Sequence, residues 1–149
     1  YVRSMKLTLQ PDEVQVCQMV GRMRTLIARG NGVRDAKMGN QDGSEADVMG
    51  MMAEYGFAKQ MNVFPDLGLS PRSGSADGVM ASGKRYDVKA SKHEQAHLLS
   101  TLKVNPDVDV YVLAIVHSAW SMDRPSTSRD GHTRRNLFSI GTRPTWDMG

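Results

Sequence analysis

The sequence predicts an α+β fold in which a central mixed β-sheet is flanked by helices. Two observations support this class. Apolar residues recur at helical spacing in the first 62 residues, and short β-branched runs bounded by turn residues dominate after residue 63. Because helices and strands do not alternate regularly along the chain, we expect helices packed on a mixed sheet.

Length and composition indicate one intracellular domain. The 149 residues are enough for a single core but few for two, so we expect one domain over residues 1–149. The one cysteine, Cys17, excludes an intrachain disulfide and a cysteine-rich zinc site. No apolar run approaches the roughly 18 residues of a membrane span, and the N-terminus lacks the pattern of a signal peptide. We therefore expect a cytoplasmic protein that makes no membrane contact.

The first element is expected to be a helix from Pro11 to Gly30. Proline suits the first turn of a helix, the acids after it suit the positive end, and Gly30-Asn-Gly32 ends the pattern. The helical spacing predicts an apolar stripe made of Val16, Met19, Val20, Met23 and Ile27.

A second helix is expected from Ser44 to about Asn62. Ser44 and Asp47 have the spacing of a capping box. Residues 48–58 are apolar or small on nearly every side, which predicts burial on more than one face. Glu54 is the only carboxylate in that stretch.

The remaining elements are expected to be strands. Residues 63–69 form a broken extended segment, and residues 76–80 and 84–90 form a β-hairpin around Ala81-Ser-Gly83. Residues 97–104 fit a strand or a helix equally well. Residues 109–117 are continuously apolar, which predicts a central strand covered on both faces. We expect a long mobile loop at about 118–135 and a last strand at 136–141.

The hairpin gathers two carboxylates and a lysine. Strand alternation places Asp87 and Lys89 on one face. A three-residue turn pairs Met80 with Lys84, so Asp77 lies opposite Asp87 with Cβ atoms about 5 Å apart. Two carboxylates at this distance repel each other unless a cation intervenes, and Mg²⁺ prefers such oxygen ligands. The alternative is a solvent-facing hairpin with ordinary surface ion pairs.

Glu54 adds a third carboxylate from the second helix. In an otherwise buried helix a lone glutamate lies at the edge of the buried surface, pairs with an arginine, or binds a metal. Mg²⁺ and an adjacent lysine are together suited to the attack of water on a phosphodiester.

These residues resemble the PD-(D/E)XK nuclease superfamily, in the compact form found in phage nucleases and Holliday-junction resolvases. The resemblance covers residues 44–117 and follows the order of helix acid, strand Asp, Asp-x-Lys and apolar strand. It implies an α/β/α restriction-endonuclease-like core. It also implies an Mg²⁺-dependent deoxyribonuclease, with Mn²⁺ as a substitute, located in the host cytoplasm if phage-encoded.

The resemblance also implies the roles of individual residues. Asp77 and Asp87 are the metal-binding acids, Lys89 is the catalytic lysine, and Glu54 binds the metal directly or through water. The main-chain carbonyl of Val88 is a further ligand. After the lysine, Gln95 is the choice for an additional polar active-site residue.

Two features depart from the pattern of the superfamily. Ala76 precedes Asp77, so the name-giving Pro-Asp pair is absent there. Pro65-Asp66 spells the pair, but it lies twenty-one residues before Asp87 and is the weaker candidate.

Basic residues supply the expected contacts to DNA, duplex or branched. The net charge of +3 is modest, but arginines cluster on the first helix and in the loop before the last strand. Such residues hold phosphates without reading sequence. Solvated surfaces are the alternative interpretation. The predicted set is Arg22, Arg24, Arg29, Arg34, Lys92, His93, Arg124, Arg129, Arg134 and Arg135.

Three functions from different classes remain open at this point. The first is the nuclease, which acts as an endonuclease and, by the habit of the superfamily, as a homodimer. The second is a non-catalytic nucleic-acid-binding or virion-associated protein that keeps the nuclease fold. The third is a scaffold without a nucleic-acid role. An ATP site and a zinc-protease site are excluded because the chain lacks their motifs, GxxxxGK[ST] and HExxH.

Overall fold

The computed structural model describes residues 4–31, 43–70, 76–92, 105–117 and 136–142. The predicted third element at 97–104 and the predicted loop at 118–135 lie outside these ranges. The described part has the α+β class that the sequence predicts, with two helices and one mixed sheet.

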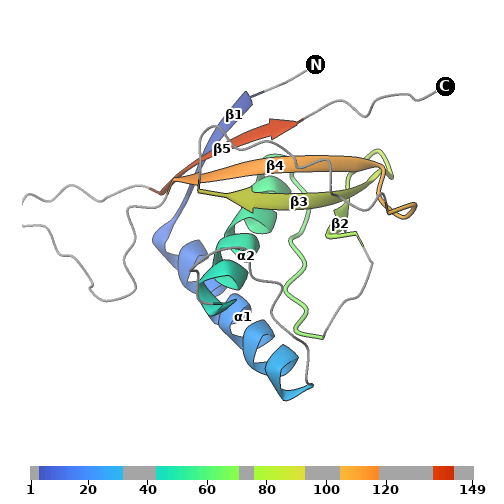
Figure 1. The fold of residues 1–149 in the computed structure, drawn as a ribbon. Helices are drawn as coiled ribbons and strands as arrows, with labels where there is room; N and C mark the ends of the chain where they lie inside the picture. Colours follow the sequence, from blue (N-terminus) through green and yellow to red (C-terminus); the bar gives the residue numbers. More distant parts are fainter. Residues whose placement is uncertain (1–3, 32–42, 71–75, 93–104, 118–135, 143–149) are drawn as a thin grey trace, which may run out of the picture.

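The sheet has five strands in the order β1-β5-β4-β3-β2 (Figure 1). Its only parallel pair among the described strands is β3 with β4, and the remaining pairs are antiparallel. β4 takes the central position that its apolar sequence predicts. The strands are β1 (Ser4–Leu9), β2 (Gly78–Val79), β3 (Arg85–Ser91), β4 (Val110–His117) and β5 (Asn136–Thr142).

β1 is a strand that we did not predict from the sequence. It forms the edge of the sheet beside β5, from the opposite end of the chain. Its signal is a short alternation in which Leu7 and Leu9 are separated by Thr8. Leu9 is buried in the core.

Both described helices lie on the same face of the sheet (Figure 1). They are α1 (Pro11–Gly30) and α2 (Gly43–Gln60), close to the predicted bounds. α2 packs against the strands, and α1 packs against α2. The described layers are therefore α1, then α2, then the sheet.

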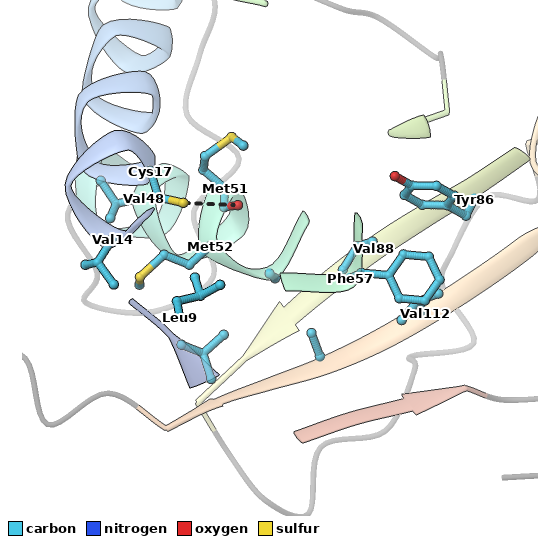
Figure 2. Packing of buried hydrophobic residues seen from close by; sticks show 13 residues of the cluster. Leu9, Val14, Cys17, Val48, Met51, Met52, Phe57, Tyr86, Val88 and Val112 are labelled. Atoms are coloured by element: carbon cyan, nitrogen blue, oxygen red, sulfur yellow. Dashed lines mark hydrogen bonds between the residues drawn. The ribbon is translucent and has the colours of Figure 1, made fainter. Parts of the chain in front are cut away.

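α2 contributes to the core on more than one side, as its composition predicts. Met51, Met52 and Phe57 are all buried, together with the smaller residues between them. The Phe57 ring meets the Tyr86 ring of β3 edge to face, with centroids 4.7 Å apart (Figure 2). The apolar surface buried around α2 holds the helices on the sheet.

The buried face of α1 differs from the predicted stripe. Met19 and Met23 are 68% and 44% exposed. The residues buried against α2 are instead Val14, Cys17, Gly21 and Thr25. The reason is the close approach of the two helices at Gly21, where long methionine side chains do not fit.

The contact at Gly21 leaves no room for a side chain. A Cβ atom built there would lie 2.7 Å from the Cα atom of Val48 and 2.8 Å from its nitrogen. One turn later, the buried Thr25 hydroxyl bonds to the carboxylate of Asp47. The capping-box acid predicted for α2 thus also joins the two helices.

No helix in the described ranges is long and apolar enough to cross a membrane.

We expect Gly21→Ala to destabilise the protein by about 1–3 kcal/mol, because the new methyl group forces the helices apart. Gly50→Ala is the matched control, since a Cβ atom at Gly50 meets nothing within 4 Å. The control should stabilise α2 by up to about 1 kcal/mol through its higher helix propensity. Urea unfolding measures both changes, and equal effects of the two substitutions would contradict the close helix contact.

We expect the thiol of Cys17 to be unreactive in the folded protein. Cys17 is fully buried between the helices (Figure 2), and burial raises its pKa from 9.0 to about 12, an increase to which Glu13 and Glu54 add. Iodoacetamide at pH 8 should modify it slowly in buffer and rapidly in urea, because only the thiolate reacts.

The raised pKa of Cys17 also makes the stability of the protein depend on pH. Above pH 9 the unfolded chain ionises Cys17 while the folded protein keeps its proton, so the free energy of unfolding falls as the pH rises towards about 12. Comparison with Cys17→Ala isolates this contribution, because the substituted protein lacks that part of the pH dependence.

Candidate active site at the hairpin of β2 and β3

The hairpin has the register that the three-residue turn predicts. Gly78 pairs with Tyr86, and Val79 pairs with Arg85. The turn closes through a hydrogen bond from the Met80 amide to the Lys84 carbonyl, 2.8 Å long. Gly83 in this turn has a φ of +85°, a conformation that favours glycine. The paired residues end at Gly78 and Tyr86, and the pairing of Asp77 with Asp87 stays a prediction.

Asp77 lies immediately before β2 and is fixed to β3 by two hydrogen bonds. Its amide donates to the Tyr86 carbonyl at 2.8 Å. Its carboxylate accepts a hydrogen bond from the amide of Val88, at 2.7 Å from Oδ2 to nitrogen. The Asp77 carboxylate is therefore held beside the peptide that joins Asp87 to Val88.

Asp87 and Lys89 lie on the same face of β3, as strand alternation predicts. The amine of Lys89 is 2.7 Å from Oδ1 of Asp87. Tyr86 and Val88, which alternate with these two residues, are buried in the core with α2. Asp87 and Lys89 consequently occupy the face of β3 that points away from α2.

Oδ1 of Asp87 is the buried polar side-chain atom without a hydrogen bond in the described part of the chain. Lys89 is close enough to form an ion pair with it, but not in hydrogen-bonding geometry. The Asp87 side chain is 16% exposed, whereas that of Lys89 is 44% exposed. A buried acceptor of this kind calls for a further partner, such as a bound ion or water.

Glu54 forms an ion pair with Arg24 of α1. Oε2 of Glu54 is 3.3 Å from Nη1 of Arg24, and the two side chains are only 19% and 20% exposed. The same guanidinium donates to the carbonyls of Gly68 and Asp66, at 2.9 Å each. The arginine partner considered for a buried glutamate is thus present.

These bonds give Arg24 a structural role that the sequence did not predict. Its guanidinium was expected to contact DNA phosphates, but it ties α1 to α2 and to the segment after α2. Helical periodicity does not reveal this role, because the partners of Arg24 are 30 to 44 residues away.

Tyr86 is a residue of the site that our sequence analysis did not assign. Burial raises the pKa of its phenol, and the carboxylates of Asp77, Glu54 and Asp66 raise this pKa further. A Cβ atom at Gly78 would lie 2.3 Å from the phenol oxygen, so the phenol lies directly over this glycine. The sequence did contain a sign of this contact, because the predicted hairpin register sets Gly78 opposite Tyr86.

The acidic residues therefore occupy two surroundings. Glu54 and Asp66 approach from the side of the helices, whereas Asp87 lies on the other face of β3. Asp77, just before β2, bonds to the backbone of β3 on either side of Asp87. Within the described ranges no three Asp, Glu, His or Cys side chains are grouped so that they could hold a metal ion. Glu54, Asp77 and Asp87 are therefore not grouped so that all three could bind one cation.

The described basic residues do not converge on the hairpin. Arg22 and Arg29 are exposed residues of α1, and α1 lies on the far side of α2 from the sheet (Figure 1). Lys92, just after β3, forms an ion pair with Glu45 at the start of α2. The other predicted residues lie outside the described ranges: Arg34, His93, Gln95, Arg124, Arg129, Arg134 and Arg135.

We expect Arg24→Ala to lower the free energy of unfolding by about 2 kcal/mol or more, since it removes charged hydrogen bonds to two carbonyls and leaves Glu54 without this partner. Gln15→Ala, at an exposed position on the same helix, should change stability by less than about 0.5 kcal/mol. Urea unfolding of both variants tests this difference. Equal and small changes in the free energy of unfolding would show that Arg24 does not stabilise the helix packing.

Comparisons of the chain with family models, curated proteins and solved structures found no match. The function has to be argued from the residues of this chain.

Proposed function

We propose that the protein is an Mg²⁺-dependent DNA phosphodiesterase of the PD-(D/E)XK type, acting as an endonuclease. The observation that carries the proposal is the buried Oδ1 of Asp87, which has the Lys89 amine at 2.7 Å but no hydrogen-bond partner in the described structure. The Asp77 carboxylate is held next to the same stretch of β3. These are the three residues that the superfamily pattern assigns to metal binding and catalysis.

Asp77 and Asp87, with the Val88 carbonyl, would hold the Mg²⁺, and Mn²⁺ would substitute for it. Magnesium sites of this class use one or two carboxylates and keep waters for substrate phosphates, so two acids are sufficient. The unbonded Asp87 oxygen and the acceptor-only chemistry of both side chains fit such an ion. When bound, the ion would act as a Lewis acid and lower the pKa of a water ligand.

The protein contributes orientation and charge to the reaction. The hydrogen bond from the Val88 amide holds the Asp77 carboxylate in one orientation before any substrate arrives. The half-exposed Lys89 amine would donate to an oxygen of the scissile phosphate and to the attacking water. Water then forms the new P–O bond, the bond from phosphorus to the leaving oxygen breaks, and charge on the phosphate is stabilised by Lys89.

Glu54 is assigned an indirect role in this proposal. Its ion pair with Arg24 favours contact with the metal through water over direct coordination. Tyr86, with its phenol between Gly78 and the helix-side acids, would separate Glu54 from the face that carries Lys89.

A second candidate function is a non-catalytic nucleic-acid-binding or virion-associated protein that retains the nuclease fold. The observation in its favour is that the described residues contain no group of three metal-binding side chains. In this alternative the Asp87 and Lys89 pair is structural, and DNA is bound without cleavage.

Nicking of supercoiled and branched DNA in the presence and absence of Mg²⁺ distinguishes these functions. We expect Asp87→Asn and Lys89→Met to reduce the rate at least about 100-fold, as is typical when a charge-stabilising group is removed. The matched controls are Asp107→Asn and Lys84→Met, which remove the same charges from exposed positions near the hairpin and should retain activity.

The outcomes separate the candidates. Cleavage that survives both Asp87→Asn and Lys89→Met would reject this active site. DNA binding without cleavage by the wild type would support the second candidate, and neither activity would support a scaffold. Titration with Mn²⁺ by calorimetry gives an independent readout, because Asp87→Asn should lose the metal-binding heat even if the DNA substrate is wrong.

A further inference from the structure

Tyr86 of β3 is buried, although β3 is the strand next to the edge strand β2. It is 2% exposed and is one of the largest fully buried side chains of the described structure. Its ring meets the Phe57 ring of α2 edge to face, with centroids 4.7 Å apart (Figure 2). Packing against α2 therefore fixes the Tyr86 ring from the side of the helices.

The hydroxyl end of Tyr86 covers Gly78, its partner in β2. The two residues are directly opposed across the strand pair, and opposed residues point to the same face of a sheet. A Cβ atom at Gly78 would lie 2.3 Å from the phenol oxygen and 2.5 Å from Cζ. The phenol therefore fills the space that a side chain at Gly78 would occupy.

An aromatic ring over a glycine in the opposed strand supplies packing that the glycine lacks. β2 needs this packing, because it has two residues and forms an edge of the described sheet. Such a short strand has few backbone hydrogen bonds to hold it in place. Its second residue, Val79, is 55% exposed and buries little of its surface. We therefore expect β2 to depend on the contact between Gly78 and Tyr86.

Asp77 directly precedes Gly78, so its position depends on the same contact. The Asp77 amide donates to the Tyr86 carbonyl at 2.8 Å. The Asp77 carboxylate accepts a hydrogen bond from the Val88 amide at 2.7 Å. Both bonds require the backbone at residues 77 and 78 to keep its present distance from β3. Tyr86 contributes to that distance twice, through its ring on Gly78 and through its own carbonyl.

We propose that Tyr86 is a positioning residue for the Asp77 carboxylate. Phe57 holds its ring, and the ring holds β2 at the distance from β3 at which Asp77 reaches the Val88 amide. Tyr86 acts through Asp77 and touches neither the metal nor the substrate. Its importance for a metal site rests on the proposed function, whereas its effect on Asp77 does not.

NMR of the metal-free protein tests the positioning through the scalar coupling across one hydrogen bond, between the Val88 nitrogen and the Asp77 carboxylate carbon. The coupling should be present in the wild type and lost in Tyr86→Leu, whose shorter side chain no longer covers Gly78. Tyr86→Phe keeps the ring over Gly78 and should keep the coupling. A wild type without the coupling, or a coupling that survives in Tyr86→Leu, would overturn the proposal.

Leu9→Ala is the matched control for a general loss of packing. Leu9 is buried in β1, which forms the opposite edge of the described sheet. This substitution weakens the core away from the hairpin, so the coupling should remain. Loss of the coupling in Leu9→Ala as well as in Tyr86→Leu would show that Tyr86 is an ordinary core residue, and it would reject the proposal.

Gly78→Ala tests the same contact from β2, and it decides the proposal even if Tyr86→Leu does not fold. The new methyl group collides with the phenol and should displace β2, so the coupling should be lost. Adding Tyr86→Leu makes room for the methyl group and should restore the coupling. A coupling that is unchanged in Gly78→Ala would show that this contact does not position Asp77.

Calorimetric titration with Mn²⁺ connects the positioning to the proposed metal site. Tyr86→Leu should weaken Mn²⁺ binding at least several-fold, whereas Leu9→Ala should bind like the wild type. Equal Mn²⁺ affinities of the wild type and Tyr86→Leu would reject a role of Tyr86 in the metal site. A wild type that binds no Mn²⁺ would instead contradict the proposed function, and the coupling between Val88 and Asp77 would still decide whether Tyr86 positions Asp77.

Discussion

The burial of α2 between α1 and the sheet is the constraint on which the rest of the described structure depends. Its apolar surface accepts Tyr86 and Val88 from β3, and the Phe57 ring fixes the position of Tyr86. Because side chains alternate along a strand, this burial forces Asp87 and Lys89 onto the face away from the helices. The hydrophobic effect thus decides where the charged residues of β3 are placed.

The same constraint separates the acids that the sequence groups together. Glu54 belongs to the buried helix and forms its ion pair with Arg24 at the helix interface. Asp87 lies on the other face of β3, and its Oδ1 is a buried oxygen without a hydrogen bond. Asp77 lies just before β2, where the chain enters the sheet, and it bonds to the backbone of β3. In the proposed site Asp77 and Asp87 would hold the magnesium ion, and the role of Glu54 would be indirect.

Close helix packing has a second consequence on the outer surface of the protein. Gly21 and Thr25 allow α1 to approach α2, so the small and medium side chains of α1 face inwards. The long side chains of Met19 and Met23 then have to face outwards. The exposed methionines of α1 are therefore the counterpart of a tight internal contact.

The sequence by itself determined the local features of this protein. α1 begins at Pro11 and ends at Gly30, and the turn that ends at Gly83 sets the hairpin register, in which Gly78 pairs with Tyr86. The continuous apolar run of β4 predicts its central position. These features depend on neighbouring residues, whose turn chemistry and periodicity are visible in a short window. Only the tertiary structure decided the buried face of α1, the partners of Arg24 and Glu54, and the pairing of β1 with β5. Each of these depends on how closely distant backbones approach, and on the charges that meet there, which a one-dimensional pattern does not contain.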